Sequence, residues 1–370
     1  FYHFTFYYFM NYNNKINLYL IFNTILVEEI YMSIKKKILD KGYELGFDLI
    51  GITTAKPFTK AYKRLKKRKK QGKLPKFMNQ NIKLITHPKK VLPSANSIIS
   101  VGISYAVNLP ENEEAYISQY AKGLDYHQVV KNKLKKLTNY IKYLGNNNIV
   151  TKIFSDTGPL LERQIAKRAG LGWIGKNNNL INPDYGSYIF LGEILTNLEL
   201  PPTQNTINNK CQDCNLCLKK CKGDALTKPY YLESNKCTGY LTQKTGIISE
   251  KEREKIGHNL WGCDSQQVCP FNKNIPTNLH SEFEPILTFD MESILNFDNH
   301  KLPSNWAKTA LSWRGSRILK RNALIIIKNC NYKKYLNLVK KELKNPSPIL
   351  RAYAIWTLYN IDPNFNKKQL

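Results

Sequence analysis

The spacing of apolar residues in positions 32–200 predicts helices that alternate with strands. Ile34 and Ile38 recur at helical spacing until Gly46 ends the pattern, and a second amphipathic stretch follows at 134–144. Four short apolar runs predict buried strands at 49–52, 97–106, 149–154 and 188–195. A further helix is expected over 159–169, where a proline suits the first turn. This alternation predicts an α/β layer domain over residues 32–200.

Two regions of different character follow the Pro201-Pro202 pair. Residues 201–285 are polar and lack long apolar runs, so something other than a hydrophobic core must hold them. Residues 286–370 have a helical pattern, and the sequence SRILK at 316–320 matches SPILR at 347–351, an offset of 31 residues. This offset predicts a HEAT-like helical repeat, in which stacked helix pairs form a short solenoid.

Residues 1–31 follow neither period. They are aromatic and rich in Asn, and their apolar piece at 16–27 is too short to cross a bilayer. The small-residue cleavage site of a signal peptide is also missing. Because Met32-Ser33 resembles a natural start, we expect residues 1–31 to be translated upstream sequence or a disordered extension.

Charge adds a candidate partner. The chain carries 56 Lys and Arg against 28 Asp and Glu, a formal net charge of +28, and nine of the basic residues lie within 60–73. Such an excess suggests a polyanion, most simply nucleic acid. A biased genome, visible in the abundant Lys, Asn and Ile, is the competing explanation. No stretch approaches the roughly 20 apolar residues of a membrane span, so we expect a cytoplasmic protein without a membrane partner.

Four of the eight cysteines define an iron–sulfur motif. Cys211, Cys214, Cys217 and Cys221 follow the Cys-x2-Cys-x2-Cys-x3-Cys spacing of bacterial two-cluster ferredoxins. In that spacing the first three thiolates bind one [4Fe–4S] cluster and the fourth reaches a second cluster. A zinc site is the alternative, but zinc sites usually use two separated pairs of ligands.

The remaining cysteines complete two unequal sets. The first set consists of Cys211, Cys214, Cys217 and Cys269, and the second set consists of Cys221, Cys237 and Cys263. We expect one ordinary [4Fe–4S] cluster on the first set and a substoichiometric or atypical cluster on the second. The fourth ligand of the second cluster could be Asp264, Ser265 or water, or its corner iron could be lost to leave a three-iron cluster. Cys330 lies in the helical tail and is expected to be a buried apolar residue.

Several motifs, taken together, resemble those of the epoxyqueuosine reductase family. In chain order they are YAKGLDYH at 120–127, DTGP at 156–159, ER at 162–163, RAGLGWIGKN at 168–177, YGSY at 185–188, LGE at 191–193, the cysteine run, GCD at 262–264 and CP at 269–270. The resemblance covers residues 32–370. The combination is typical of this family, whereas the ferredoxin part alone would not be.

The resemblance implies three domains. They are a cobalamin-binding α/β domain related to that of reductive dehalogenases over 32–200, a two-cluster ferredoxin module over 201–285 and a HEAT-like repeat over 286–370. The implied reaction is the two-electron removal of the epoxide oxygen of epoxyqueuosine, at the wobble position of tRNA anticodons, to give queuosine. The implied partners are tRNA with GUN anticodons and an external single-electron donor such as a flavodoxin or ferredoxin. We expect a monomer.

The family's motifs also imply roles for residues of the α/β domain. Its catalytic acid corresponds to Asp156, and burial beside the corrin would have to raise the pKa of this carboxyl; a helix N-cap is the alternative role. The implied substrate-binding residues are Arg163, Tyr126 and His127. The implied corrin environment comprises Asp156, Lys176, Asn177, Leu180, Ile181, Asn182, Leu191, Tyr120 and Gly239. The C-terminal repeat offers tRNA the basic residues Arg317, Lys320, Arg321, Lys333 and Lys334.

The sequence departs from the family around the second cysteine set. The family pattern G-C-D-x-C-Q-x-V-C-P appears here as GCDSQQVCP at 262–270, which is one residue shorter and lacks the middle Cys. The usual Cys-Pro after the first run is Cys221-Lys222. Gly239 stands where the family has a Ser that faces the corrinoid.

Other function classes remain open at this stage. One is a corrinoid iron–sulfur reductase that acts on a small molecule, and the net charge and helical tail argue against it. Another is a non-catalytic RNA-binding protein with a structural cluster, which corrin absorbance in the purified protein would exclude. A simple electron carrier ranks last, because a ferredoxin needs no α/β domain with a DTGP motif.

Overall fold

A computed structural model describes residues 31–75, 78–109, 114–145, 148–287 and 290–365. The prediction for residues 1–31 therefore lies, apart from its last residue, outside the described part of the chain. Within that part, no helix combines the length and the apolar character that a membrane span requires.

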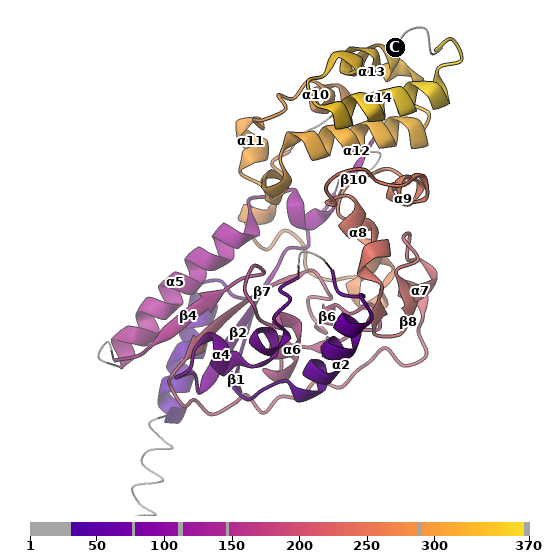
Figure 1. Cartoon of the computed structure of the whole chain (residues 1–370). Coiled ribbons are helices and arrows are strands. Elements are labelled where there is room, and N and C mark those ends of the chain that lie inside the picture. The colour runs from indigo at the N-terminus through magenta and orange to yellow at the C-terminus, as the bar shows by residue number, and fades with distance from the viewer. Residues whose placement is uncertain (1–30, 76–77, 110–113, 146–147, 288–289, 366–370) are drawn as a thin grey trace, which may run out of the picture.

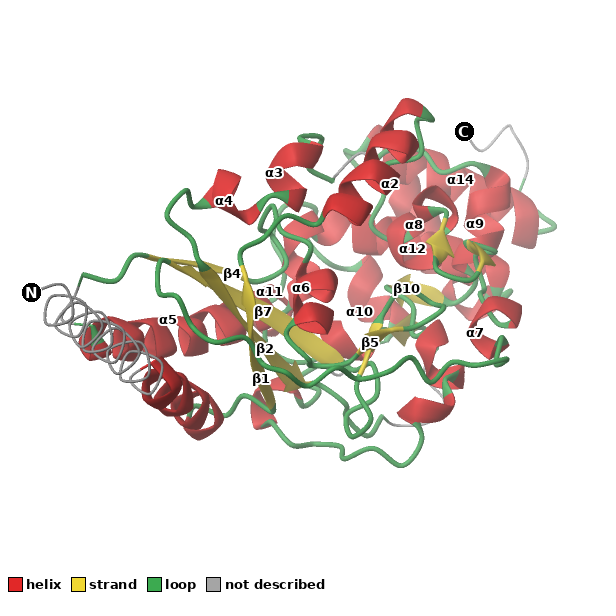
Figure 2. Cartoon of the chain, turned by 90° about the horizontal axis from the view of Figure 1, so that it is seen from below, coloured by secondary structure: helices red, strands yellow, loops and turns green. Residues whose placement is uncertain are grey.

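A four-stranded sheet forms the centre of the N-terminal part (Figures 1 and 2). Its strands, β1 (Leu49–Thr54), β2 (Ser97–Ser104), β4 (Thr151–Phe154) and β7 (Ile189–Thr196), lie in the order β1-β2-β7-β4, and every pair is antiparallel. These are the four strands that the sequence predicts. All residues of β2 are buried, so this central strand is covered on both faces.

Helices cover both faces of the sheet. A helix over residues 31–44 and α5 (Tyr126–Leu144) pack on one face, where Ile99 and Val130 share a core. The opposite face carries α6 (Glu162–Arg168), and there Ile98 packs with Ile165. Neighbouring strand residues point to opposite faces, which explains why Ile98 and Ile99 belong to different cores. The predicted helix over 159–169 begins only at Glu162, and the preceding residues form the loop that carries the candidate catalytic residue.

Shorter elements complete this part. They are α2 (Thr59–Lys70), α3 (Ile82–Thr86), α4 (Pro88–Val91), β5 (Trp173–Ile174) and β6 (Leu180–Ile181). The last two strands form a small antiparallel pair that leads from α6 back toward the sheet. The sequence around them, GWIGKN at 172–177, is one of the motifs noted above.

The cysteine-bearing region consists of short elements joined by loops. These are α7 (Leu216–Lys219), β8 (Leu226–Lys228), β9 (Tyr231–Leu232), α8 (Thr238–Leu241), α9 (Glu250–Ile256) and β10 (Asn259–Trp261). The last strand pairs in parallel with β3 (Tyr116–Ile117), a segment of the N-terminal part. Ala115, Ile117 and Ala121 join the hydrophobic core of the C-terminal helices. The β3–β10 strand pair thus joins the α/β part to the cysteine-bearing region, and the residues around β3 also pack in the core of the C-terminal helices. No local sequence pattern predicts this pair.

Among the described residues, five α-helices form the C-terminal part at the top of Figure 1. They are α10 (Met291–Leu295), α11 (Ser304–Ala307), α12 (Ser316–Asn329), α13 (Leu336–Lys341) and α14 (Pro348–Ile361). Helices α12 and α14 pack against each other, and Ala323 and Ala354, which the 31-residue offset relates, are both fully buried. The HEAT-like interpretation of this packing stays a prediction.

Two basic residues of this part differ from the expectation that they face tRNA. Lys320 is 4% exposed and forms an ion pair with Glu342, with 2.9 Å between Nζ and Oε1. Arg321 is 1% exposed and donates to the main-chain oxygen of Thr242 at 3.2 Å. The prediction that these two side chains present a tRNA surface is wrong, because both are committed to holding α12 against its neighbours.

Candidate active site and cysteine centres

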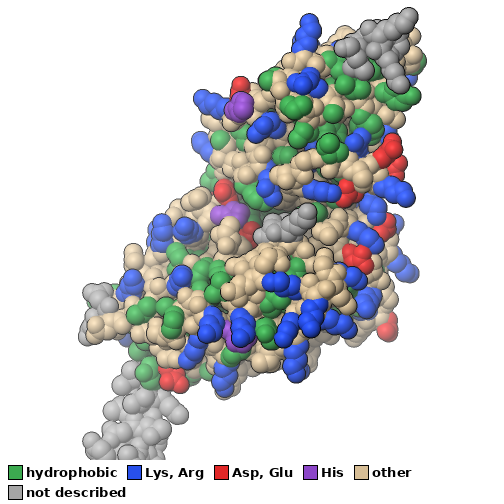
Figure 3. All heavy atoms as spheres, in the orientation of Figure 1, with side chains coloured by type: hydrophobic (Ala, Val, Ile, Leu, Met, Phe, Trp, Pro, Cys, Tyr) green, Lys and Arg blue, Asp and Glu red, His purple; other side chains and the backbone are tan. Residues whose placement is uncertain are grey.

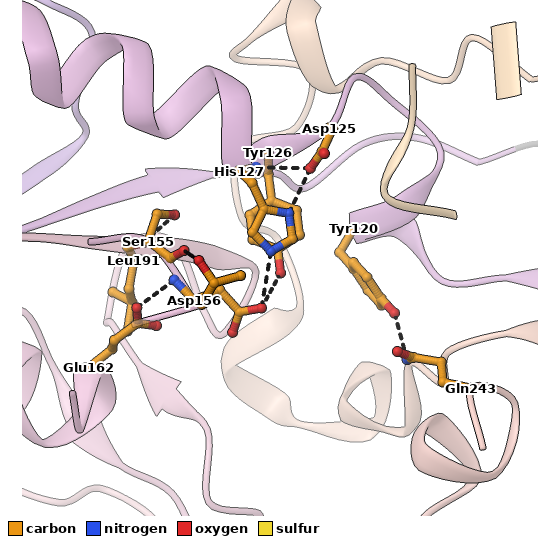
Figure 4. A network of polar contacts seen from close by, with 10 residues as sticks. Tyr120, Asp125, Tyr126, His127, Ser155, Asp156, Glu162, Leu191 and Gln243 are labelled. Carbon is orange, nitrogen blue, oxygen red and sulfur yellow. Dashed lines mark hydrogen bonds and ion pairs between the residues drawn. The ribbon is translucent and has the colours of Figure 1, made fainter. Parts of the chain in front are cut away.

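The Asp156 side chain lies where the chain leaves β4, in a loop between the sheet and α6 (Figure 4). Its backbone is left-handed, with φ of 57°, a conformation that Asp and Asn tolerate better than most residues. One carboxylate oxygen, Oδ2, accepts a hydrogen bond from the Tyr126 hydroxyl at 2.7 Å and lies 3.2 Å from Nε2 of His127. The side chain is 58% exposed, so a substrate can reach it.

The start of α5 holds the partners of Asp156 in place. Asp125 is the N-cap of this helix, accepts from the backbone N–H of His127 at 3.0 Å and lies 2.7 Å from its Nδ1. The Tyr126 ring stacks on Phe190 of β7, with 4.2 Å between centroids and nearly parallel planes. A helix cap and a ring stack therefore fix both groups that face Asp156.

These contacts decide where the proton of the site resides. Burial lowers the pKa of His127, but the hydrogen bonds to Asp125 and Asp156 outweigh it and raise the pKa to about 9. Burial raises the pKa of Asp156, yet hydrogen bonds from His127 and Tyr126 lower it overall. At neutral pH the imidazole is protonated and the carboxyl is ionised. The prediction of a raised Asp156 pKa is wrong, because a cationic ring faces the carboxylate.

The alternative role for Asp156 is also wrong. The N-cap of α6 is Leu161, so Asp156 does not cap that helix. Instead its backbone N–H donates to Oε1 of Glu162, in the first turn of α6. This bond ties the Asp156 loop to the helix that follows it.

A pair of acids behind the loop has no assigned role in the sequence argument. Glu193 of β7 is fully buried, and neither oxygen of its carboxyl has a hydrogen-bond partner among the described residues. Burial and then the charge of Asp156 raise the pKa of Glu162 to about 8. Burial and then Glu162 raise the pKa of Glu193 well above its usual range. In the sequence, the single acid within the apolar strand sequence IFLGEILT was the feature that could have indicated a buried carboxyl.

Arg163 links the Asp156 loop to the loop that precedes β6. Its guanidinium donates to the main-chain oxygen of Asn178 at 2.7 Å, and its charge helps to lower the pKa of Asp156. In that loop the amide nitrogens of Asn177 and Asn178 are buried and, among the described residues, have no hydrogen-bond partner. Buried donors of this kind suit a ligand rich in amide oxygens, which the corrin ring carries at its edge.

The other residues expected around the corrin in this part of the chain make contacts within the protein. Lys176 donates through Nζ to the main-chain oxygen of Gln212 at 2.6 Å, so it holds the cysteine loop. Ile181 packs in one cluster with Trp173 and Cys269, while Leu180 and Leu191 belong to another cluster. The Asn182 side chain donates to the main-chain oxygen of Leu171 at 2.8 Å and accepts from the N–H of Asp184, which is a turn-forming role.

Tyr120 and Gly239 are joined through Gln243. The amide nitrogen of Gln243 donates to the Tyr120 hydroxyl at 3.1 Å and to the main-chain oxygen of Gly239 at 3.0 Å. A Cβ placed on Gly239 would meet Sγ of Cys237 at 3.7 Å, which is ordinary contact. This position therefore borders the second cysteine set and leaves room for a side chain.

The structure brings the four cysteines of the first set together. Burial raises the pKa of Cys217, and the nearby thiols of Cys211, Cys269 and Cys214 raise it further. Cys211 and Cys269 both pack against Trp173. The two segments of this set are 52 residues apart in sequence, and the loop around α7 carries the first three.

The other three cysteines form a separate group. Burial raises the pKa of Cys237, and the thiols of Cys263 and Cys221 contribute to the same shift. The N–H of Ala225 donates to Sγ of Cys221 at 3.3 Å. Across the described ranges, no three His, Cys, Asp or Glu side chains are close enough to share a single metal ion. The thiolates of a cubane cluster bind separate corner irons, so they do not need to meet at one point.

Comparisons with known proteins agree with this arrangement. Residues 210–272, which contain all seven cysteines of the two sets, match the 4Fe-4S double cluster binding domain. Residues 86–157 match the family described as "Epoxyqueuosine reductase QueG, DUF1730". The epoxyqueuosine reductase of Bacillus cereus is 33% identical over 344 residues, 90% of each chain. The chain belongs to the epoxyqueuosine reductase family. The family member of Bacillus subtilis is 32% identical and covers 90% of this chain.

Solved structures of epoxyqueuosine reductases share the fold over nearly the whole chain. A selenomethionine-labelled family member superimposes with a TM-score of 0.86 at 32% identity, covering 90% of this chain and 91% of that one. Another, solved with a tRNA-Tyr epoxyqueuosine-modified tRNA stem loop, gives a TM-score of 0.85 at 30% identity and covers 92% and 96% of the two chains. In a Bacillus subtilis family member, with a TM-score of 0.84, the catalytic aspartate loop is swung out of the active site.

Proposed function

We propose that this chain reduces epoxyqueuosine to queuosine in tRNA, with Asp156 as its catalytic residue. The observation that carries the proposal is the Asp156–His127 pair, in a member of the epoxyqueuosine reductase family whose chain also brings together two separate cysteine sets. A general acid at the reacting oxygen and a route for electrons are the two things that reductive removal of an epoxide oxygen needs.

The cysteine sets are proposed to hold two iron–sulfur clusters. Cys211, Cys214, Cys217 and Cys269 would ligate the first, and Cys221, Cys237 and Cys263 would supply three ligands to the second. The corrin site would lie against the loop that carries Asn177 and Asn178, whose buried amides are open donors. Tyr120 and Gly239 would border it from the side of the second cluster. Cobalamin, when bound, supplies the electrons that break the epoxide C–O bond.

The chain itself would supply the first proton that the departing oxygen receives. Removal of the epoxide oxygen consumes two electrons and two protons and releases water. The proposed donor of the first proton is Asp156, whose carboxylate takes the proton from Nε2 of His127 and then passes it to the departing oxygen, because the resting pair holds its proton on the imidazole. The second proton comes from solvent. Tyr126 and Arg163 would orient the carboxylate, by a hydrogen bond and by charge respectively.

The tRNA is proposed to lie along basic surface that includes α2. Lys60, Lys63, Arg64, Lys66, Lys67, Lys69 and Lys70 are exposed on this helix. Lys and Arg side chains gather over the lower part of the face that Figure 3 shows, where α2 lies in Figure 1. Arg68 of the same helix donates to the main-chain oxygen of Leu232, which places the helix beside the cysteine-bearing region.

Finer features of the family are proposed for this chain as well. They are selectivity for tRNA with GUN anticodons, an external single-electron donor of the flavodoxin or ferredoxin kind, a monomeric state, and a HEAT-like repeat that includes α12 and α14. A cytoplasmic location is proposed as well, because the proposed substrate is tRNA. The proposed division is 32–200, 201–285 and 286–370, with 115–121 reaching across to the C-terminal core.

Conversion of epoxyqueuosine-containing tRNA by anaerobically reconstituted protein tests the proposal. Formation of queuosine is the expected result. A protein that binds the tRNA but shows no corrin absorbance after reconstitution would be an RNA-binding protein with structural clusters. Activity on small epoxides or halides, with none on tRNA, would favour a small-molecule reductase.

A further inference from the structure

The second cysteine set lacks a ligand. Cys221, Cys237 and Cys263 provide three thiolates, whereas a [4Fe–4S] cluster is normally held by four. The fourth ligand must come from a side chain near these three or from water. The segment 264–267, which follows Cys263 directly, carries the nearest polar candidates in sequence.

The carboxylate of Asp264 already accepts hydrogen bonds from other parts of the chain. It is 5% exposed, and its carboxylate accepts hydrogen bonds from three donors on the segment that continues β3. The Tyr116 hydroxyl and the backbone N–H of Gln119 donate to Oδ2, each at 2.8 Å, and the Ser118 hydroxyl donates to Oδ1. Turning this carboxylate toward iron would leave those buried donors without an acceptor, which is unfavourable for each group.

The two glutamines are also engaged elsewhere. Gln266 accepts from the Asn179 amide at 2.7 Å and donates to the Tyr105 hydroxyl at 3.2 Å. Gln267 donates to the Tyr116 hydroxyl at 3.0 Å. Both side chains tie the loop to the α/β part of the chain, and their amide groups hold no negative charge to offer to iron.

Ser265 is different. Its hydroxyl oxygen lies 2.8 Å from Sγ of Cys263, so it points toward the second cysteine set. It opens the 3-10 turn Ser265–Val268, whose backbone then leads to Cys269 of the first set. The side chain is therefore held at the boundary between the two sets, on the side of the incomplete one.

We propose that Oγ of Ser265 is the fourth ligand of the second cluster. The inference rests on the proposed iron–sulfur function of these cysteines. On binding, the Ser265 hydroxyl leaves its contact with Sγ of Cys263 and gives its proton to solvent, and the alkoxide oxygen binds the separate iron that the three thiolates leave open. No change in iron oxidation state is needed for this step. The chain would then hold one cluster with four thiolate ligands and one with three thiolates and an oxygen.

The oxygen ligand has a consequence for electron transfer. Ligand type, net charge and hydrogen bonding set the reduction potential of a cluster. A hard oxygen donor stabilises ferric iron better than a soft thiolate does, so it lowers the potential of the second cluster relative to an all-cysteine cluster at the same site. The two clusters of this chain would thus differ in potential by virtue of one side chain.

Iron analysis and EPR spectroscopy of the anaerobically reconstituted full chain test the proposal without any activity assay. The variants are S265A, which removes the ligand, and S265C, which replaces the oxygen by a thiolate. The matched control is Q267A, from the same turn, whose amide contacts only the Tyr116 hydroxyl among the interactions described above. Wild-type protein and the control should hold about eight irons per chain in two clusters.

We expect S265A to lose about one iron per chain and to gain the EPR signal of a three-iron cluster. S265C should keep its iron, and the potential of its second cluster should rise. Unchanged iron content and spectrum in S265A would overturn the proposal and leave water as the ligand, with the Ser265 hydroxyl only bonded to the Cys263 sulfur. If S265A fails to fold, an S265C potential equal to that of wild type would overturn it equally. Because neither readout uses tRNA, failure of the reductase assay would not affect the result.

Discussion

Nε2 of His127 lies 3.2 Å from Oδ2 of Asp156, and the pair holds one proton that resides on the imidazole at neutral pH. The carboxylate is thus a relay between a charged ring and the substrate rather than a permanently protonated acid. Asp125 on the far side of the ring fixes its orientation, with 2.7 Å between its Oδ1 and Nδ1 of His127. The arrangement predicts distinct effects for changes at each member.

Replacement of Asp156 by Asn should remove turnover while it leaves the fold intact. Asn tolerates the left-handed backbone at this position, and its amide can still accept from Tyr126. Loss of the proton relay should lower kcat about 100-fold to 10,000-fold, while corrin and cluster absorbance stay unchanged. D184N, at an exposed Asp of a neighbouring turn, should behave as wild type. Wild-type rates for D156N would show that the proton comes from elsewhere.

Turnover should depend on the charge of His127. Because its pKa is about 9, the imidazole loses its proton as the pH rises through that value, and kcat should fall there. The H127Q variant should be slow and should lack this fall, whereas H300Q, at an exposed His, should keep it. A kcat profile of wild type that stays flat from pH 8 to about 10 would contradict the relay.

The His127–Asp156 pair should also make the free energy of unfolding depend on pH. The pKa of His127 is raised above its unfolded value of about 6.5, so its contribution is fully present below that pH and is lost as the pH rises to about 9. Urea unfolding should show this loss in wild type, and H127Q should show a smaller one. Equal pH dependence in the two proteins would argue against a raised His127 pKa.

The raised pKa values of Glu162 and Glu193 predict a second decrease in stability with rising pH. Both carboxyls have raised pKa values, so folding favours their protonated forms, and the stability they provide is lost as the pH rises above about 4.3. For Glu162 this loss extends to about pH 8. E193Q mimics the neutral acid and should weaken this dependence, with little change in stability at low pH. E199Q, an exposed acid just after β7, serves as the control. A stability profile of E193Q that parallels wild type would mean that Glu193 is ionised.

The basic face of α2 should contribute to tRNA affinity in a salt-dependent way. Each phosphate contact adds a slope of about −0.7 to −0.9 to log K against log salt. K63A/K67A should weaken binding and make the slope shallower, whereas K36A/K37A, which removes the same charge from the helix over 31–44, should not. Filter binding at several salt concentrations measures both. Equal slopes for the two double variants would place the tRNA elsewhere.

Local patterns in the sequence were enough to predict the sheet and the grouping of the thiols. Apolar runs located all four strands, and the spacing of the cysteines predicted which of them come together. The apolar runs of the strands and the spacing within the cysteine run are local features, so they can be recognised in a single sequence. The role of these thiols as ligands stays a prediction.

Features that depend on distant contacts could not be predicted in this way. The direction of the Asp156 pKa shift depends on His127, which lies 29 residues earlier and is oriented by a helix cap. The pairing of β3 with β10 joins segments more than 140 residues apart. The burial of Lys320 and Arg321 likewise depends on partners outside their own helix, so their charge alone suggested an exposed face.

The most direct test of the account is mass analysis of epoxyqueuosine-containing tRNA after incubation with the reconstituted protein and a reductant. Wild type should convert the epoxyqueuosine nucleoside to queuosine, and D156N, prepared with the same corrin and iron content, should leave it unchanged over the same period. Unchanged epoxyqueuosine in the presence of fully loaded wild-type protein would contradict the proposed function, and equal conversion by both proteins would contradict the role of Asp156.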